Sequence, residues 1–507
     1  MITQNIIGYQ LSGSSGRSIY SFNPTTQQNL EYEFIVATPD EVNLAMDKAI
    51  EAWRIFRNMP GHQKAKFLRA IADGIEALGD ELVKTITAET GYPEARIITE
   101  RNRTCAQLRM FAELTETEDW REITIDEALP NRVPAPRPEL RRMMMPIGPV
   151  VVFGASNFPL AYSTMGGDAV AALAVGCPVI IKAHESHLCT NALVAEVVMK
   201  AAQSTQMPDG VFSSLNGDGL ETGKQLVLHP NTAAVGFTGS FRGGKALFDL
   251  GMSREKPIPI FAEMGSVNPI FLLPGVLKGD REGLVTKLVA SMTMTAGQFC
   301  TKPGIIVIQQ SDNTEIFINE LKTALEKIQA VPLLNKSIAS NFHRGIEEMQ
   351  QAPKVTLVSN HNEVGQKASP VLAIVGSDDY MQNPKWHFEI FGPYSLVVIC
   401  QNSKDFLRIG ESIAGQLTAS IFYESNEIEL AEALREVLVE KAGRIIFNGV
   451  PTGVEVCAAM THGGPFPAST DFRFTAVGHF SIRRWLRPVT FQNADPKLLP
   501  GIMQPRQ

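Results

Sequence analysis

From Pro146 onward, short runs of Val, Ile and Phe alternate with Ala- and Leu-rich stretches of helical periodicity. The runs predicted to be strands are 150–153, 179–181, 211–215, 233–237 and 258–262. Apolar strands separated by helices predict a parallel sheet that is covered by helices on both faces. The expected fold class is therefore α/β, with an architecture in the style of dinucleotide-binding domains.

A second series of the same kind follows from Asn268 to about Thr461. Its predicted strands are 305–308, 371–375, 395–400 and 445–448. We expect a domain boundary near Glu263, where the first series ends. With 507 residues, a chain of roughly two to four domains is expected.

The first third of the chain is predicted to be mainly helical. Thr38 and Glu41 have the spacing of a capping box, and apolar residues then recur at helical spacing. A second apolar stripe covers 67–86, and 93–118 is predicted to be a third helix. Residues 127–145, with four prolines, are expected to form an extended excursion.

Composition excludes several classes of protein. Hydrophobic residues are 44% and the net charge is −7, without long runs of one sign, so no basic surface for nucleic acid is expected. No signal-peptide pattern and no apolar run of about 18 residues occurs, which argues against secretion and membrane spanning. The six cysteines have neither metal-site nor disulfide-framework spacing. We expect free thiols in a cytoplasmic protein.

Cys300 is the first candidate for chemistry. It lies in GQFCTKPG, between a helical pattern and the strand at 305–308, and functional residues concentrate on such loops. Nearby positive charge or helix-terminal donors would lower the pKa of a nucleophilic thiol there. A small buried thiol without a chemical role fits the same local sequence equally well.

Two further candidates follow strands. Glu263 ends an apolar strand at the sheet edge where α/β proteins bind ligands, and an apolar setting would raise its pKa toward that of a general base. Asn157 follows 150–153 and carries an amide donor that could face an oxyanion. A salt-bridged glutamate and a turn-forming asparagine are the alternatives.

The turn GFTGSFRGG, residues 236–244, joins a strand to a helix, so its backbone N–H groups could receive a pyrophosphate. It departs from G-x-G-x-x-G, and packing alone could explain its glycines. Lys182 and Glu185, just beyond another strand, could hold a ribose. His184 and His187 have the spacing H-x-x-H, but no further ligand completes a set, so no metal site is predicted.

Together these segments resemble the aldehyde dehydrogenase superfamily. The matching segments, in the superfamily's order, are PIGPVVVFGASNFP, Lys182 with Glu185, GFTGS with Gly244, EMG at Glu263, GQFC at Cys300 and EIFGP from Glu389 to Pro393. Within the superfamily, the chain is most similar to the α-ketoglutaric semialdehyde dehydrogenases and related bacterial fatty aldehyde dehydrogenases. That likeness rests on GQFCTKPG, NGVPTGVEV from Asn448, HGGP from His462 and the tail to Pro488.

The resemblance implies the roles of the catalytic residues. Cys300 would attack the aldehyde carbon, Asn157 and the Cys300 backbone N–H would hold the oxyanion, and Glu263 would activate the water that hydrolyses the thioester.

The resemblance also implies a cofactor site. The residues expected to bind the cofactor are Lys182, Glu185, Gly239, Ser240, Gly244, Glu389 and Phe391. NAD is favoured over NADP, because the carboxylate of Glu185 would accept a ribose 2′-hydroxyl and repel a 2′-phosphate. Lys182 could offset part of that repulsion.

The expected substrate is 2,5-dioxopentanoate, oxidised to 2-oxoglutarate. Its remote carboxylate should meet a cation, and Arg103, Arg109 and Arg473 are the candidates. Medium- or long-chain aldehydes are the alternative if no cation lines the site. A redox-free thiol esterase or acyl transferase, and a non-catalytic member of the fold, are the alternatives from other classes.

The family fold implies a dinucleotide-binding domain of residues 1–126 and 146–262 and a catalytic domain of 263–470. Segments 127–145 and 471–500 would supply oligomer contacts. A homodimer is the minimum expectation.

Overall fold

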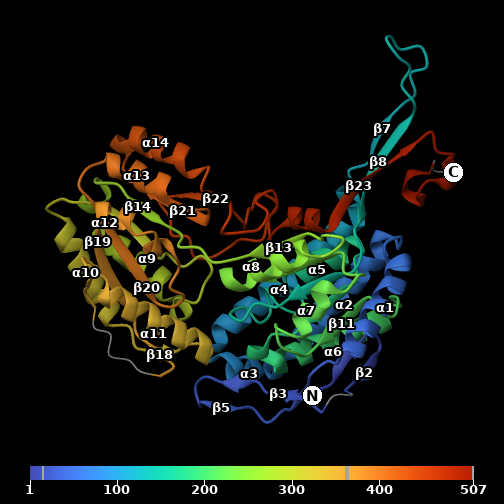
Figure 1. Ribbon diagram of the computed structural model, residues 1–507, viewed down its shortest axis with the longest axis horizontal. Coiled ribbons are helices and arrows are strands. Elements are labelled where there is room, and N and C mark those ends of the chain that lie inside the picture. The colour runs from blue at the N-terminus through green and yellow to red at the C-terminus, as the bar shows by residue number, and fades with distance from the viewer. Residues whose placement is uncertain (14–15, 360–364, 505–507) are drawn as a thin grey trace.

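The computed structural model describes residues 1–13, 16–359 and 365–504. Its two largest sheets have seven strands each and lie in separate bodies, and a three-stranded arm projects from the first body (Figure 1). This confirms the predicted α/β class.

The first sheet has the order β13-β12-β9-β10-β11-β1-β2. Its strands are β9 (Val150–Phe153), β10 (Val179–Lys182), β11 (Phe212–Leu215), β12 (Ala234–Thr238), β13 (Ile260–Glu263), β1 (Asn5–Ile7) and β2 (Gln10–Ser12). The five predicted strands are all present and pair in parallel, so their carboxyl ends share one edge. Strands β1 and β2 add antiparallel pairings at the other side and were not predicted.

Helices cover this sheet on both faces (Figure 1). They are α1 (Pro39–Phe56), α2 (Gly61–Ala77), α3 (Gly79–Thr90), α4 (Glu94–Thr117), α5 (Gly167–Val175), α6 (Leu188–Ser204), α7 (Thr222–Leu228) and α8 (Phe241–Met252). The capping box of Thr38 and Glu41 is confirmed at the start of α1. The stripe over 67–86 forms two helices instead of one, because the chain turns at Gly79, whose φ is +51°.

The second sheet has the order β17-β19-β20-β15-β14-β21-β22. Its strands are β17 (Thr356–Leu357), β19 (Val371–Gly376), β20 (Tyr394–Cys400), β15 (Ile305–Gln309), β14 (Ile270–Leu272), β21 (Gln416–Phe422) and β22 (Ala442–Phe447). The helices around it are α9 (Arg281–Thr293), α10 (Thr314–Glu326), α11 (Lys336–Gln351), α12 (Ser377–Gln382), α13 (Lys404–Ser412) and α14 (Ile428–Leu438). The four predicted strands are present, whereas β14, β17 and β21 were missed.

The excursion predicted at 127–145 belongs to the arm. Its strands are β7 (Thr124–Asp126), β8 (Leu140–Pro146) and β23 (Leu486–Gln492), all antiparallel. The arm projects away from both large sheets, with the C-terminal segment beside it (Figure 1). Its role in oligomer contacts, and the division into domains at residue 263, stay predictions.

Short strand pairs complete the fold: β3 (Ser18–Ile19) with β6 (Phe34–Ile35), β4 (Phe22–Asn23) with β5 (Gln28–Asn29), and β16 (Val331–Pro332) with β18 (Lys367–Ala368). Within the described ranges, no helix is long and apolar enough to cross a membrane.

After β22 the chain returns from the second sheet to the first. The backbone N–H of Met264 donates to the carbonyl of Ala468 at 2.8 Å, and Glu263 and Ser469 form an antiparallel bridge. This return carries His462 to the end of β13. The carboxyl edge of the first sheet thus meets residues of the second body.

Candidate functional site

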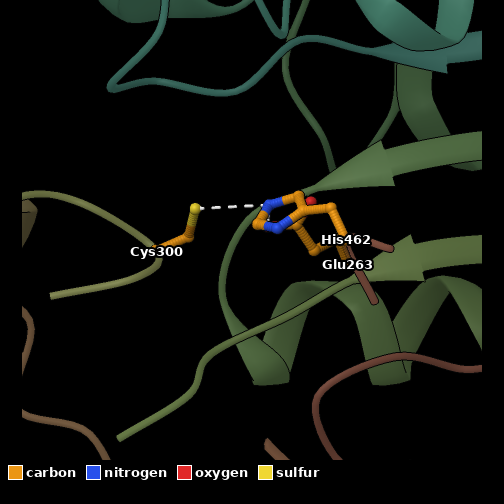
Figure 2. Close-up of side chains that lie close together, drawn as sticks. All are labelled: Glu263, Cys300 and His462. Carbon is orange, nitrogen blue, oxygen red and sulfur yellow. Dashed lines mark hydrogen bonds and ion pairs between the residues drawn. The ribbon is translucent and has the colours of Figure 1, made fainter. Parts of the chain in front are cut away.

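Three reactive side chains converge between the two large sheets (Figure 2). The sulfur of Cys300 lies 3.6 Å from Nε2 of His462. The same Nε2 lies 3.0 Å from Oε1 of Glu263, and the side chains of His462 and Glu263 are 1% and 4% exposed. A thiol, an imidazole and a carboxylate therefore form one chain of groups that can exchange a proton.

Each member comes from a different part of the fold. Glu263 is the last residue of β13, so the sheet fixes its backbone. Cys300 lies on the loop before β15, and His462 lies on the return segment, where its N–H donates to Thr475 Oγ1 at 2.9 Å. The site forms only when both bodies and the return segment are in place.

The loop before Cys300 has unusual backbone geometry. Thr295 and Ala296 have φ of +51° and +54°, and Gly297 has +65°. A non-glycine residue in the left-handed region costs on the order of 1–3 kcal/mol and persists only where its surroundings impose it. Strain of this kind concentrates at functional sites.

Asn268 holds the part of the loop that carries Cys300. Its Nδ2 donates to the carbonyls of Cys300 and Lys302, at 2.8 and 3.0 Å. Its Oδ1 accepts from Thr418 Oγ1 of β21 at 2.9 Å. A fully buried amide thus connects the thiol loop to the floor of the second sheet.

The environment opposes ionisation of the thiol. Burial, and then the negative charges of Glu263 and Glu389, raise the pKa of Cys300 well above its ordinary value. A resting thiol therefore needs a base to become a nucleophile. His462 is placed to be that base.

The structure brings Asn157 to the thiol loop. Its Nδ2 donates to the carbonyl of Gln298 at 2.9 Å, and its side chain is buried. Arg96 supports the same turn by donating to the carbonyl of Asn157 at 2.9 Å, while its guanidinium pairs with Glu100 at 3.0 Å. One N–H of the amide remains available for a further acceptor.

The predicted phosphate-binding residues lie at the start of α8. Ser240 is the N-cap, and its Oγ accepts from the N–H of Gly243 at 3.2 Å. Gly239 and Gly244 permit close packing, since a Cβ would stand 2.7 Å from the Phe237 ring or 2.6 Å from the Met264 side chain. The helix start can receive an anion.

The predicted ribose-binding residues fall into two pairs. Nζ of Lys182, at the end of β10, lies 3.0 Å from Oε1 of Glu185. Glu389, followed closely by partly buried Phe391, faces the backbone of Gly265 and has a buried Oε1 that no described residue hydrogen-bonds. An unpaired buried carboxylate oxygen fits a sugar hydroxyl as its partner.

A cavity of about 1010 Å³ opens beside Cys300. Its walls include aromatic and apolar side chains such as Phe158, Phe299 and Met460. Two arginines in the wall, Arg103 and Arg444, have no carboxylate within 4 Å among the described residues. A remote negative charge on a substrate would find a cation there.

Arg109 and Arg473, the other two arginines predicted for a substrate carboxylate, lie outside this cavity. Arg109 binds Asp73 and Glu76 on the outer face of α2, and Arg473 is exposed and paired with Asp471. Both cations are thus occupied by acidic neighbours.

Sequence reasoning did not assign His462, Asn268 or Arg444 to the site. HGGP at His462 was noted only as a family likeness, and a histidine beside three turn-forming residues gives no local sign of chemistry. Arg444 directly precedes the predicted strand 445–448, where a charged residue is usually taken as exposed, although the observed strand β22 includes it.

The predicted absence of a metal site rested on His184 and His187. Their rings stack with centroids 5.4 Å apart. Elsewhere in the described chain, the ligand atoms of Glu263, Cys300 and His462 lie within 4.8 Å of one another, close enough for a metal ion. The absence of a metal therefore stays a prediction.

Known proteins are similar to this chain over nearly its whole length. A family model described as the aldehyde dehydrogenase family matches residues 11–467. α-Ketoglutaric semialdehyde dehydrogenase 2 of Azospirillum brasilense is 42% identical over 503 residues, which cover 98% of this chain and 96% of that protein. α-Ketoglutaric semialdehyde dehydrogenase of Acinetobacter baylyi is 42% identical over 508 residues, covering 99% and 95%.

Solved structures share the fold at low sequence identity. Betaine aldehyde dehydrogenase of Staphylococcus aureus in complex with NAD⁺ has a TM-score of 0.83 at 18% identity, covering 97% of this chain and 96% of that one. 1-Pyrroline-5-carboxylate dehydrogenase from Thermus with bound NAD has a TM-score of 0.83 at 21% identity, covering 97% and 92%. The chain therefore belongs to the aldehyde dehydrogenase family, whose members oxidise aldehydes to acids with NAD or NADP.

Proposed function

We propose that this enzyme oxidises 2,5-dioxopentanoate, the semialdehyde of α-ketoglutarate, to 2-oxoglutarate with NAD. Two relatives that are 42% identical carry the name of this activity. The observation that carries the substrate is the pair Arg103 and Arg444, two cavity arginines without a carboxylate partner among the described residues.

Catalysis begins with proton transfer from the Cys300 thiol to His462 across the 3.6 Å contact. The Glu263 carboxylate, 3.0 Å from the same imidazole, stabilises the imidazolium that forms. The thiolate then attacks the aldehyde carbon to form a thiohemiacetal. The free N–H of the Asn157 amide and the Cys300 backbone N–H hold the oxyanion, an interaction worth about 2.7–4 kcal/mol.

When bound, the nicotinamide would supply the two-electron oxidant, and loss of a hydride from the thiohemiacetal carbon would leave a thioester on Cys300. Glu263 takes a proton from the water that hydrolyses this thioester, and the leaving thiolate takes its proton back from the His462 imidazolium. The acid leaves, and the sulfur regains its proton. The same two groups thus serve both halves of the reaction.

The proposed cofactor-binding residues are those that the resemblance implies. Ser240 and Gly239, at the start of α8, would hold the pyrophosphate, the unpaired oxygen of Glu389 would accept from a hydroxyl of the nicotinamide ribose, and Phe391 would lie beside the ring. Glu185 favours NAD by repelling a 2′-phosphate. The contact of Lys182 with Glu185 reduces that repulsion, so the preference for NAD is modest.

The substrate carboxylate lies between Arg103 and Arg444. Arg103 stacks over Tyr162, with its guanidinium carbon 5.3 Å from the ring centroid, so the phenol orients it toward the cavity. The terminal nitrogens of Arg444 donate to the carbonyls of Pro451 and Gly453, and its buried Nε has no hydrogen-bond partner in the described chain. Arg96, also in the wall, is neutralised by Glu100.

The test compares two five-carbon aldehydes, one with and one without the 2-oxo acid group, and relies on the arginine variants to isolate the effect of the carboxylate charge. Wild-type enzyme should give a kcat/KM for 2,5-dioxopentanoate at least about tenfold above that for pentanal, and Arg103→Met and Arg444→Met should each reduce that ratio by about tenfold or more. Arg109→Met, outside the cavity, is the matched control and should leave it unchanged. Preference for pentanal in the wild type would refute the semialdehyde assignment.

Medium- or long-chain aldehydes are the second candidate. The cavity of about 1010 Å³ exceeds what a five-carbon acid fills, and Phe158, Phe299 and Met460 give it an apolar wall. Octanal belongs in the same assay. A kcat/KM for octanal above that for the semialdehyde would support this candidate.

We further propose a homodimer built on the arm of β7, β8 and β23, which presents exposed Ile125, Leu129 and Val133. Domains of 1–126 with 146–262, and of 263–470, accord with the two sheets. Six free thiols support a cytoplasmic location. Sedimentation equilibrium of the purified protein tests the dimer.

A further inference from the structure

Lys302 is a fully buried lysine two residues after Cys300. Its side chain is 1% exposed, and Nζ donates to the carbonyls of Tyr394 and Ile390, at 2.7 and 3.4 Å. Among the described residues, no carboxylate lies within 4 Å of Nζ. Burying an ammonium without an ion pair is costly, and nothing in the chemistry of Cys300, His462 and Glu263 uses this group.

Both carbonyls belong to the segment that carries the ribose-binding residues. Ile390 follows Glu389 directly, and Tyr394 opens β20 just after Phe391. The Lys302 ammonium therefore connects the thiol loop to the Glu389–Phe391 segment from within the protein. Of the bonds made by the Lys302 side chain, the one to Tyr394 is short and fully buried.

Other contacts hold the same two segments close together. A Cβ on Gly297 would stand 2.4 Å from the carbonyl oxygen of Gly392. Ser395 Oγ donates to the carbonyl of Pro303 at 2.6 Å. The two segments are packed backbone to backbone, and Lys302 supplies the charged group of this junction.

Lys302 also acts on the charge of Glu389. Burial raises the pKa of Glu389 to about 7, and the Lys302 charge opposes that rise. Burial lowers the pKa of Lys302 to about 8, and Glu389 opposes it in turn. The negative charge of Glu389 also raises the pKa of the Cys300 thiol. A carboxylate that accepts ribose hydroxyls serves best when ionised.

We propose that Lys302 is a positioning residue that sets the spacing between the Cys300 thiol and the ribose-binding segment Glu389–Phe391. The inference rests on the proposed role of Glu389 toward the cofactor. Hydride transfer requires the nicotinamide and the thiohemiacetal carbon in near-attack geometry, and a misplacement of about 1 Å can cost roughly 100-fold in rate. Lys302 would thus matter for the redox step and not for the thiol itself.

The test separates cofactor-dependent from cofactor-independent chemistry. In Lys302→Met, we expect the Kd for NAD, measured by quenching of protein fluorescence, to rise by about tenfold, and kcat for NAD reduction to fall by at least about tenfold. Hydrolysis of p-nitrophenyl acetate, in which Cys300 is acylated and water releases acetate, should stay within about twofold. The increase in Kd should be larger at lower pH, because Glu389 without the Lys302 ammonium becomes protonated at a higher pH than in the wild type.

Two variants control for burial and charge. Lys64→Met removes another fully buried lysine, on α2 beside Trp120, and should change none of these readouts. Lys302→Arg keeps the charge and should recover part of the affinity for NAD. If Lys302→Met does not fold, Lys302→Arg carries the comparison, since a displaced cation should still lower NAD reduction more than ester hydrolysis.

An equal loss of both activities, or an unchanged Kd and kcat, would overturn the role of Lys302. If the wild-type enzyme fails to reduce NAD with every aldehyde tested, the proposed function itself is refuted. The two failures are therefore distinguishable in the same set of measurements.

Discussion

The two sides of the site are held in different ways. Glu263 ends a strand that pairs with β12 on one side and with the return segment on the other, through Met264 with Ala468 and Thr470 with Ala262. Cys300 lies on a loop in no sheet, with left-handed residues before it and side chains beneath it. Backbone hydrogen bonds between strands fix Glu263, whereas a few side-chain hydrogen bonds fix the thiol of Cys300.

This difference has a functional meaning. Several backbone hydrogen bonds hold the strand of Glu263, so single substitutions near Glu263 should leave its position unchanged. A loop held by the side chains of Asn157, Asn268 and Lys302 depends on a few groups, and a segment with few such bonds opens at lower free energy. The thiol can therefore adjust during the covalent steps while Glu263 stays in place.

The largest effect is expected from removing the thiol. Cys300→Ala should lower NAD reduction by at least about 1000-fold, because the covalent intermediate cannot form. The absorbance of NADH measures it. Cys457→Ala, at another partly buried cysteine, should retain activity, and substantial turnover by Cys300→Ala would refute covalent catalysis.

Removing the imidazole should have the next largest effect. His462→Asn is expected to lower kcat by about 100- to 10,000-fold at neutral pH. Because the pKa of Cys300 is raised, its thiol stays protonated without a base, so the activity of the variant should climb steeply as pH rises. The pH profile of kcat/KM measures this shift.

His62→Asn, at an exposed histidine of α2, is the control for that profile. It should follow the wild type at every pH. A parallel profile for His462→Asn would mean that another group takes the thiol proton.

Sequence patterns predicted the parallel strands of the first sheet and β15, β19 and β20 of the second because those strands are mostly apolar. Strand β21 was missed because Gln416, Thr418 and Ser420 suggest an exposed face, yet all three are buried. Gln416 accepts from Ser266 and Val267, and Thr418 donates to Asn268. The polar residues that hide this strand from a hydrophobicity pattern build the support for the thiol loop.

The candidate site could likewise be predicted only in part from the sequence. Cys300, Glu263 and Asn157 follow or precede predicted elements, so their neighbourhood could be inferred from topology and family motifs. His462 arrives on a return segment without helix or strand, and its contact with Glu263 depends on the pairing of 468–470 with β13. Long-range pairing of that kind leaves no periodic pattern in the sequence.

A matched pair of substitutions compares the two sides directly. Asn268→Ala removes the donors to Cys300 and Lys302 and leaves a residue with φ of +44°, so we expect about 1–3 kcal/mol of lost stability and a kcat about tenfold lower. Thr470→Val removes the acceptor of the Ala262 N–H beside Glu263. We expect it to destabilise comparably but to lower kcat less than about threefold.

Urea unfolding and steady-state kinetics on both variants measure this contrast. If Thr470→Val lowers kcat as much as Asn268→Ala, activity is as sensitive to substitutions near Glu263 as to substitutions near Cys300. The distinction between ladder and loop would then be wrong.

The smallest effect on activity, and an opposite effect on stability, is expected at Lys64. Burial lowers its pKa from 10.5 to about 7, so between these values the unfolded chain binds more protons than the folded one, and folding stability rises with pH. Lys64→Met removes that penalty. It should raise the free energy of unfolding by on the order of 1–3 kcal/mol below about pH 7, with the gain shrinking toward about pH 10.

Urea midpoints at low and high pH, together with kcat, test this expectation. Lys302→Met should gain stability in the same direction, since burial also lowers the pKa of Lys302. Only Lys302→Met should lose NAD reduction. Both buried ammonium groups, of Lys64 and of Lys302, would then cost stability, but only that of Lys302 would contribute to catalysis. Equal kinetic behaviour of Lys64→Met and Lys302→Met would contradict this distinction.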